Sequence, residues 1–268
     1  MDWENFLPKE NEDGIYGYVD NEDNWVIEPK YNFANDFCEG FALVELDDKY
    51  GYIRPDGTYL VEPKFDDAQD FSEGFAAVKL EGKWGYIKLD GTYLVEPKFN
   101  NASKFCEGFA RVKLDGKYGF IKHDGTYLIE PQYDEADFFR EGFALIELHG
   151  KWGHIKSDGT YLIEPQYDDA GTFREGFAAI NLDGKWGYIK PDGTYLVKPK
   201  FDDAWDFREG FAVVELHGKY GFIKPDGTYL VEPKFDDACG FNEGIAEVVW
   251  QDEEGYIDTE GNFTSYLD

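Results

Sequence analysis

Residues 187–220 read GYIKPDGTYLVKPKFDDAWDFREGFAVVELHGKY, and close copies of this stretch fill most of the 268-residue chain. The first glycine of the stretch recurs every 34 residues without insertion or deletion, at Gly17, Gly51, Gly85, Gly119, Gly153, Gly187, Gly221 and Gly255. A fixed period of this length is the signature of a repeat protein. The sequence therefore predicts a single array of about eight units over residues 1–268, with residues 1–16 and 255–268 as its caps.

Turn-forming residues divide each unit into strands. Asp183-Gly184 lies between runs of alternating apolar residues and favours a type I′ hairpin turn, because both residues tolerate positive φ. Pro191-Asp192-Gly193 has the residues of a type I turn followed by a bulge. We therefore predict an all-β fold in which each unit is a three-stranded antiparallel meander, with strands at 176–182, 185–190 and 195–198.

The rest of the unit, residues 199–209, connects one meander to the next. It begins with proline, and its Asp202-Asp203-Ala204 run favours a single capped helical turn. The glycine that follows Trp or Tyr in each copy, such as Gly187, is expected to permit close approach of another backbone or ring.

Apolar side chains are expected on both faces of each sheet. In the first strand Ala178 and Ile180 share one face and Ala179 lies on the other, while the middle strand places Tyr188 and Ile189 on opposite faces. Of the 49 aromatic residues, 42 fall in six columns that repeat with the period, which indicates a structural role. His154 replaces tyrosine in one column, and we interpret it as filling a tyrosine position. Such sheets are buried by stacking on their neighbours.

The run GKWGYIK at 82–88 and 184–190, followed by DGTYLV and closed by FxEGFA, resembles the bacterial WG (KWG) repeat family. The resemblance covers residues 16–268, with Tyr in place of Trp at Tyr16, Tyr50, Tyr118 and Tyr220. It implies an all-β repeat module with a role in interactions, and it implies no catalytic residues.

The charge distribution favours an open stack. Residues 17–50 and 221–254 each carry a net charge of −7, whereas residues 85–118 carry +2. The chain also starts just before a middle strand and stops after a last strand, so its ends do not complete one shared unit. Polar, atypical end units keep exposed sheets from associating. We expect an open, superhelical, solenoid-like array; a closed eight-bladed β-propeller is the alternative.

Composition bears on partners and compartment. The net charge of −30 repels phosphate backbones and anionic lipid, and no apolar stretch approaches the roughly 18 residues of a membrane span. Three cysteines, Cys38, Cys106 and Cys239, are too few for a disulfide framework. We expect a cytoplasmic monomer that binds neither nucleic acid nor membrane.

Signatures of catalysis and metal binding are missing from the sequence. It contains no HExxH, GxSxG, phosphate-loop or CxxC motif. Paired aspartates such as Asp66-Asp67 suggest a hard cation, but the same column holds Asn100-Asn101, so turn or capping use is the favoured interpretation. We predict no enzyme activity, no metal and no cofactor.

Positions that vary between copies are the candidate binding residues. One column reads Cys38, Ser72, Cys106, Arg140, Arg174, Arg208 and Asn242. Its three consecutive arginines would form a basic ladder suited to a carboxylate or phosphate. Each arginine precedes a glutamate and faces many acids, however, so internal ion pairing is the favoured interpretation. Trp205 and Phe138 are the large aromatic residues in two adjacent variable columns and are candidate contacts, although local packing is the favoured interpretation for Trp205.

An invariant framework with variable surface columns predicts a non-catalytic scaffold that binds a protein or peptide. The second hypothesis is a glycan-binding module that stacks sugars on Tyr and Trp faces. An enzyme is disfavoured because catalysis needs one asymmetric constellation, whereas the units are nearly equal.

Overall fold

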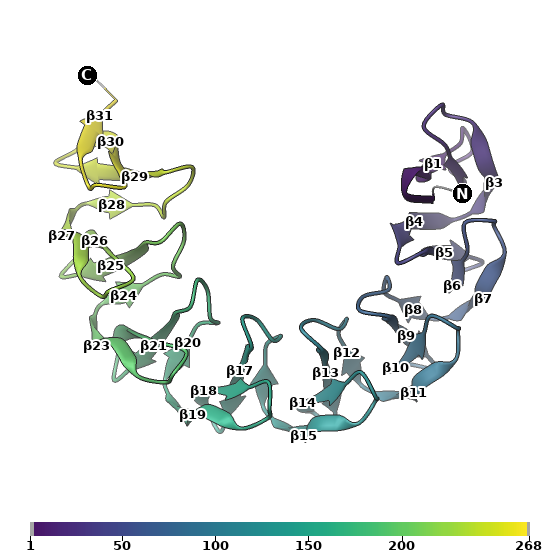
Figure 1. Ribbon diagram of the computed structural model, residues 1–268, viewed down its shortest axis with the longest axis horizontal. Helices are drawn as coiled ribbons and strands as arrows, with labels where there is room; N and C mark the ends of the chain where they lie inside the picture. Colours follow the sequence, from purple (N-terminus) through teal and green to yellow (C-terminus); the bar gives the residue numbers. More distant parts are fainter. Residues whose placement is uncertain (1–2, 267–268) are drawn as a thin grey trace. The chain divides into compact units, whose positions relative to one another are not determined.

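The computed structural model describes residues 3–266, which form a short 3₁₀ helix, η1 (Trp3–Asn5), and eight antiparallel sheets (Figure 1). Contacts divide the chain into two compact halves, each containing several repeats: residues 1–133, called the first unit below, and residues 134–268, called the second unit. Each unit contains four sheets. The outermost residues of both predicted caps, 1–2 and 267–268, lie outside the described part. No helix within residues 3–266 is long and apolar enough to cross a membrane.

The first unit begins with the one three-stranded sheet of the described chain, and three four-stranded sheets follow. Its strands are β1 (Leu7–Glu10), β2 (Tyr16–Val19) and β3 (Trp25–Tyr31); β4 (Phe33–Cys38), β5 (Phe41–Leu46), β6 (Lys49–Ile53) and β7 (Tyr59–Phe65); β8 (Asp67–Ala68), β9 (Phe75–Leu80), β10 (Lys83–Lys88) and β11 (Tyr93–Phe99); and β12 (Asn101–Ala102), β13 (Phe109–Leu114), β14 (Lys117–Lys122) and β15 (Tyr127–Tyr133).

The second unit has four sheets of four strands. Its strands are β16 (Glu135–Ala136), β17 (Phe143–Leu148), β18 (Lys151–Lys156) and β19 (Tyr161–Tyr167); β20 (Asp169–Ala170), β21 (Ala178–Leu182), β22 (Lys185–Ile189) and β23 (Tyr195–Phe201); β24 (Asp203–Ala204), β25 (Ala212–Leu216), β26 (Lys219–Ile223) and β27 (Tyr229–Phe235); and β28 (Asp237–Ala238), β29 (Ile245–Trp250), β30 (Glu253–Asp258) and β31 (Phe263–Ser265).

The prediction of three strands per repeat is wrong for seven of the eight sheets, because each of these has a fourth strand. The connector supplies it: β24 pairs antiparallel with β25, Asp203 opposite Glu215 and Ala204 opposite Val214. The expected helical turn does not form, because Asp202 N and Trp205 N donate to Glu215 O and Val213 O and keep the connector extended. These hydrogen bonds join residues about a third of a period apart, beyond the reach of local capping chemistry.

The last strand is longer than predicted. β23 runs to Phe201 and contains Pro199, although proline cannot donate to a sheet ladder. The pairing with β22 shifts register around Gly187, where Trp186 lies opposite Phe201 and Tyr188 lies opposite Val197. A Cβ at Gly187 would come within 2.5 Å of Val197 O and 2.6 Å of Pro199 N. The expectation that this glycine permits close backbone approach is confirmed.

Both predicted turns are confirmed, and the structure adds a third. Asp183 and Gly184 have φ of 53° and 75°, as a type I′ turn requires, and Gly193 has φ of 80° in the turn that follows. In the third turn Glu209 and Gly210 have φ of 52° and 81°, while Arg208 and Phe211 exchange backbone hydrogen bonds. The Glu-Gly pair that repeats in this chain is therefore another hairpin turn.

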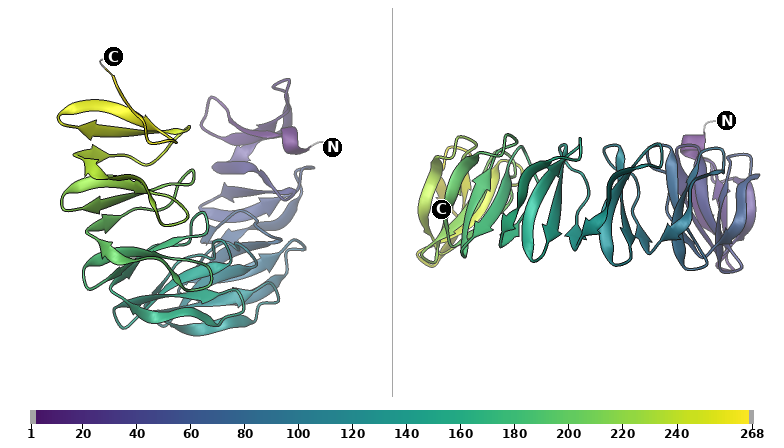
Figure 2. Two further views of the ribbon diagram at one scale, coloured as in Figure 1. Left: turned by 60° about the vertical axis from the view of Figure 1, so that its left-hand side comes forward. Right: turned by 90° about the horizontal axis from the view of Figure 1, so that it is seen from below.

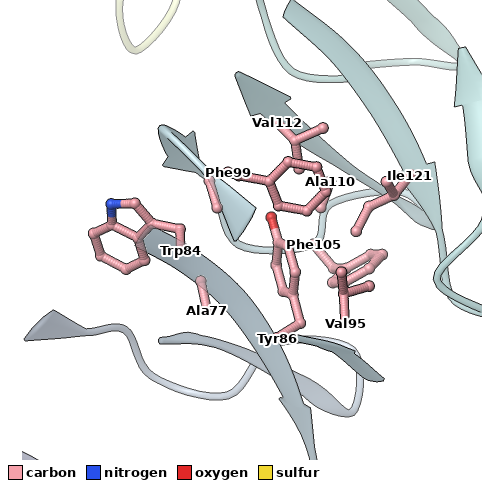
Figure 3. Close-up of a cluster of buried hydrophobic side chains, with 10 residues drawn as sticks. Ala77, Trp84, Tyr86, Val95, Phe99, Phe105, Ala110, Val112 and Ile121 are labelled. Atoms are coloured by element: carbon pink, nitrogen blue, oxygen red, sulfur yellow. The ribbon is translucent and has the colours of Figure 1, made fainter. Parts of the chain in front are cut away.

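Stacking buries both faces of the inner sheets of each unit, as predicted (Figure 2). Ala178, Ile180 and Ile189 pack toward the preceding sheet, whereas Ala179 and Tyr188 pack toward the following one. Each hydrophobic cluster joins two successive sheets. In Figure 3, Tyr86 of β10 lies among Phe105 and side chains of the next sheet. The ring centroids of Tyr86 and Phe105 are 5.3 Å apart, an edge-on contact of the kind that aromatic pairs prefer.

Candidate binding groove

The predicted site residues come together in the second unit. Arg140, Arg174, Arg208 and Trp205 line one groove of about 730 Å³. The fifth candidate, Phe138, is 39% exposed and does not line it. The groove collects residues from four successive copies of the repeat, because Ala238, Cys239 and Gly240 of the next copy also line it. Whether it binds a ligand stays a prediction.

The arginines are placed by the Glu-Gly turns. Arg174 immediately precedes such a turn, and its N–H donates to Phe177 O at 2.9 Å while its C=O accepts from Phe177 N at 3.0 Å. Because these two hydrogen bonds close the two-residue turn, the residue that precedes the turn has the same backbone position in every copy. The three arginine side chains consequently start from equivalent backbone positions on successive sheets.

A carboxylate ladder joins successive turns. Glu141 accepts from the backbone N–H groups of Glu175 and Gly176 at 2.7 and 2.8 Å. Glu175 accepts in the same way from Glu209 and Gly210, both at 2.8 Å. Each glutamate thus binds the two adjacent N–H groups of the turn one period later, which are exposed by their positive φ. Charge-assisted hydrogen bonds of this kind are short and directional, so they hold the turns that line the groove in register.

The ladder continues to Glu209, whose carboxylate accepts from Glu243 N and Gly244 N at 2.8 Å. These backbone donors hold the pKa of Glu209 below its ordinary value, because they stabilise the ionised form. The expectation from sequence was that acidic residues beside the arginines would pair with them. The glutamates instead bind backbone N–H groups.

Internal ion pairing is confirmed for one arginine of the three. Arg174 Nε lies 2.7 Å from Asp206 Oδ2. Arg208 donates a terminal nitrogen to the amide oxygen of Asn242 at 2.6 Å. Within residues 3–266, Arg140 has no carboxylate oxygen within 4.0 Å of its guanidinium nitrogens. Two of the three guanidinium groups therefore keep donors available to a ligand.

Asp206 lies beside two arginines of the ladder and is nearly half exposed. Burial raises the pKa of Asp206, and the charges of Arg174 and Arg140 oppose that rise. On its other side lies Gly171, where a Cβ would be 3.3 Å from Asp206 Oδ1. The carboxylate is thus held by the basic ladder in space that a glycine leaves free.

Trp205 presents its side chain at the surface. The backbone of Trp205 is fixed, because its N–H donates to Val213 O at 3.1 Å and its C=O accepts from Tyr188 Oη at 2.7 Å. Trp205 is 41% exposed, and the centroid of its ring lies 5.8 Å from that of Tyr220. Local packing therefore covers part of the ring and leaves an apolar surface beside the arginines.

The paired aspartates have structural partners. Asp202 forms an ion pair with Lys185 and accepts from His217 N at 2.5 Å, while Asp203 accepts from Ala204 N at 2.8 Å. In the part of the chain that the structure describes, no group of three or more His, Cys, Asp or Glu side chains is placed to hold a metal ion. These aspartates therefore have structural partners, but the predicted helix cap does not form, since Asp202 binds Lys185 and a turn N–H 15 residues later.

Sequence reasoning missed eight of the twelve residues that line the groove. Three of these eight are Asp206, Cys239 and Gly240. All three stand in the two variable columns that contain Trp205 and Phe138. The sequence therefore identified their columns as variable but did not show that these members lie beside the arginines. The signal lies in the period: Asp206 follows Arg174 by 32 residues, which places the two on adjacent copies at nearly the same level.

Comparison with solved structures finds similarity of fold. A crystal structure of the eukaryotic initiation factor has a TM-score of 0.50 and 11% identity, over 96% of this chain and 82% of that one. The Hsv2p structure from Kluyveromyces lactis has a TM-score of 0.41 and 8% identity, over 82% of this chain and 89% of that one. The WD40 β-propeller domain of Doa1 has a TM-score of 0.30 and 11% identity, over 80% of this chain and 87% of that one.

A search of curated proteins finds no match. The model of the WG containing repeat matches seven consecutive stretches, residues 16–50, 50–84, 84–118, 118–152, 152–186, 186–220 and 220–252. These matches follow the 34-residue period and together cover most of the chain. The protein belongs to the WG containing repeat family.

Proposed function

We propose that this repeat β scaffold is a non-catalytic binding protein, and that the groove of the second unit takes a peptide segment of a partner protein. One observation carries the proposal: three arginines from consecutive repeats and a surface tryptophan line one groove. Arginine and tryptophan are the residue types most enriched among those that dominate protein interfaces.

The contrast between fixed and variable columns supports this role. Side chains of the repeating columns, such as Tyr52, Phe65 and Phe99, are fully buried and have no surface to offer a ligand. The arginines, Trp205 and Asp206 of the groove come from columns that change from copy to copy. Fixed columns supply the rest of its frame, including Glu141 and Glu175. A scaffold of this kind keeps its packing constant while its surface changes.

A peptide library tests the proposal. The full-length chain is used to select binders from a random 12-residue library displayed on phage, and the affinities of synthetic copies are measured by fluorescence anisotropy. We expect Trp205→Ala to weaken binding by about tenfold or more, as loss of a central interface aromatic does. Phe138→Ala is the matched control, because Phe138 is similarly exposed and lies outside the groove. Failure to select any binder, or equal binding by the Trp205 variant, would refute the proposed function.

The glycan alternative draws on Trp205 alone among the groove residues. Most tyrosines of the repeat are half-buried or buried, so the recurring aromatic faces do not offer a row of stacking surfaces. A glycan array that binds the wild-type chain and not Trp205→Ala would replace the peptide proposal.

We further propose an open array in preference to a closed ring, and a monomer. The support is the charge distribution, in which the first and last complete periods are the most acidic, at −7 each. Like charges on the two terminal sheets disfavour their mutual contact. Small-angle X-ray scattering at several protein concentrations tests both points: a compact disc profile contradicts the open array, and a mass that grows with concentration contradicts the monomer.

A further inference from the structure

Arg174 shows how the groove holds a carboxylate. Its Nε is 2.7 Å from Asp206 Oδ2, and Asp206 follows Arg174 by 32 residues. The 34-residue period places Thr172 in the same relation to Arg140, and Gly240 in the same relation to Arg208. The position that holds Asp206 opposite Arg174 therefore holds a threonine opposite Arg140 and a glycine opposite Arg208.

The position opposite Arg208 is open. A Cβ at Gly240 would meet no atom within 4 Å, and Gly240 lines the groove together with Arg208 and Trp205. One terminal nitrogen of Arg208 donates to Asn242. No carboxylate of residues 3–266 lies within 4.0 Å of the Arg208 guanidinium. Since a guanidinium carries five N–H donors, most of them remain for a ligand.

Other acidic groups near the ladder have oxygens that are already engaged. Glu141 and Glu175 line the same groove, and each binds two backbone N–H groups of the next Glu-Gly turn. Asp206 is bound to Arg174. The arginines at the two ends of the ladder, Arg140 and Arg208, are therefore those left without an internal carboxylate.

We propose that Arg208, above the space at Gly240, binds a carboxylate side chain of an acidic segment from a partner protein, as Arg174 binds Asp206. The inference rests on the proposed function and adds the chemistry of its ligand. Trp205 lies on the same groove and packs against the ligand residue next to the carboxylate.

The spacing of the ladder gives a second acidic residue. Stacked sheets lie about 10 Å apart, so Arg140 and Arg208, two copies apart, are separated by about 20 Å. Six residues of an extended strand span about 20 Å, and six residues of a polyproline II helix span about 19 Å. Both conformations return residues i and i+6 to the same face. A ligand with carboxylates six residues apart therefore reaches Arg140 and Arg208 and passes over Arg174, which Asp206 already neutralises.

Gly240→Asp tests the inference without removing an arginine. The new carboxylate would pair with Arg208 as Asp206 pairs with Arg174, and it would occupy the ligand's place. The probes are the peptides selected from the random phage library on the wild-type chain, measured by fluorescence anisotropy. We expect affinity to fall about tenfold or more, the scale of a hydrogen bond to a charged group. Gly240→Asn is the matched control of equal size and no charge, and circular dichroism checks that both variants fold.

Two further comparisons bear on the same subsite. Selected peptides should contain Asp or Glu, and replacing that residue by Asn or Gln should weaken them as much as Gly240→Asp does. In an Arg208→Gln background, Gly240→Asp should have no additional effect.

Binders that lack acidic residues, equal affinity of Gly240→Asp and wild type, or binding only by phosphoserine versions of the peptides would overturn the carboxylate subsite while leaving the peptide-binding groove intact. A library that yields no binder overturns both.

Discussion

His154 shows what a single position of the repeat requires. In other copies the tyrosine hydroxyl of this column donates to a connector carbonyl; Tyr52 donates to Gln69 O at 2.6 Å and Tyr188 to Trp205 O at 2.7 Å. His154 Nε2 lies 2.8 Å from Gly171 O, so it acts as the donor in the same place. Its Nδ1 is buried and has no hydrogen-bond partner within residues 3–266. The interpretation of His154 as a tyrosine substitute is therefore confirmed, with one unsatisfied atom as its cost.

We expect His154→Tyr to stabilise the fold most strongly at low pH. Burial lowers the pKa of His154 to about 4 from its ordinary 6.5. The unfolded chain therefore binds a proton below pH 6.5 that the folded chain does not bind until about pH 4, and stability falls as the pH drops through this window. The full difference corresponds to about 3 kcal/mol. Chemical denaturation at pH 7.5, 6.0, 5.0 and 4.5 measures it.

The reverse variant, Tyr188→His, is the matched control. Tyr188 is fully buried and donates to the equivalent carbonyl, so the histidine should introduce a similar loss of stability between pH 6.5 and 4. If wild type and His154→Tyr lose stability in parallel over this range, the acid sensitivity comes from other groups.

Glycine at position 187 answers a different demand, for space. A Cβ would lie 2.5 Å from Val197 O and 2.6 Å from Pro199 N, both of them backbone atoms of the bulged last strand. We expect Gly187→Ala to cost about 2–3 kcal/mol, because β22 and β23 must separate locally. Gly240→Ala is the control, since a Cβ there meets nothing within 4 Å. Urea denaturation that finds the two variants equally stable would contradict this account.

At the scale of the element, local chemistry predicted the turns and not the connector. Asp183-Gly184 and Pro191-Asp192-Gly193 determine their turns through their own backbone preferences, which any window of sequence contains. The connector strand β24 depends on hydrogen bonds from Asp202 N and Trp205 N to residues of β25. Pro199 is accommodated inside β23 because it lies in the bulge opposite Gly187, where no N–H is needed for pairing with β22. Pairing partners, more than propensities, decided these two segments.

The candidate site was predicted in its residues and only partly in its contacts. The arginine column and Trp205 were found from the period, and they do line one groove. Internal ion pairing holds for Arg174, through Asp206 of the next copy, whereas the glutamates that follow the arginines bind the Glu-Gly turn one period later. Within one repeat, Arg, Glu and Gly are adjacent in sequence. Their bonding partners lie 32 to 35 residues away.

The carboxylate ladder should contribute to the stability of the stacked turns. Glu175→Gln removes one oxygen that accepts from Glu209 N or Gly210 N and weakens the other bond by removing its charge. We expect the midpoint of thermal unfolding to fall by roughly 2–4 °C, which differential scanning calorimetry measures. Glu243→Gln is the control, because within residues 3–266 the Glu243 carboxylate accepts no hydrogen bond. An equal fall for both variants would assign the effect to net charge.

At the scale of the whole molecule, stability is distributed along the chain. Each hydrophobic cluster joins two successive sheets, as with Tyr188 and Phe207 between the sheets of β22 and β25. Folding free energy in such a protein is approximately a sum over units and their nearest-neighbour interfaces. The first and last complete periods each carry a net charge of −7, which is the basis of the open array and the monomer proposed above.

Removal of one complete period tests both nearest-neighbour stability and the open array. Deleting residues 51–84 joins Tyr50 to Gly85, which have the same relation as Tyr50 and Gly51, so every strand register downstream is retained. The sheets that become adjacent present the same aromatic columns to each other. We therefore expect the shortened chain to fold, with a β-sheet circular dichroism spectrum and a cooperative thermal transition. Its midpoint should lie within a few degrees of that of the full chain, which corresponds to a change of about 1 kcal/mol in the free energy of unfolding. A closed ring would lose the unit on which its closure depends, so a chain that no longer unfolds cooperatively, or that associates to restore the missing sheet, would contradict the open array and favour the ring.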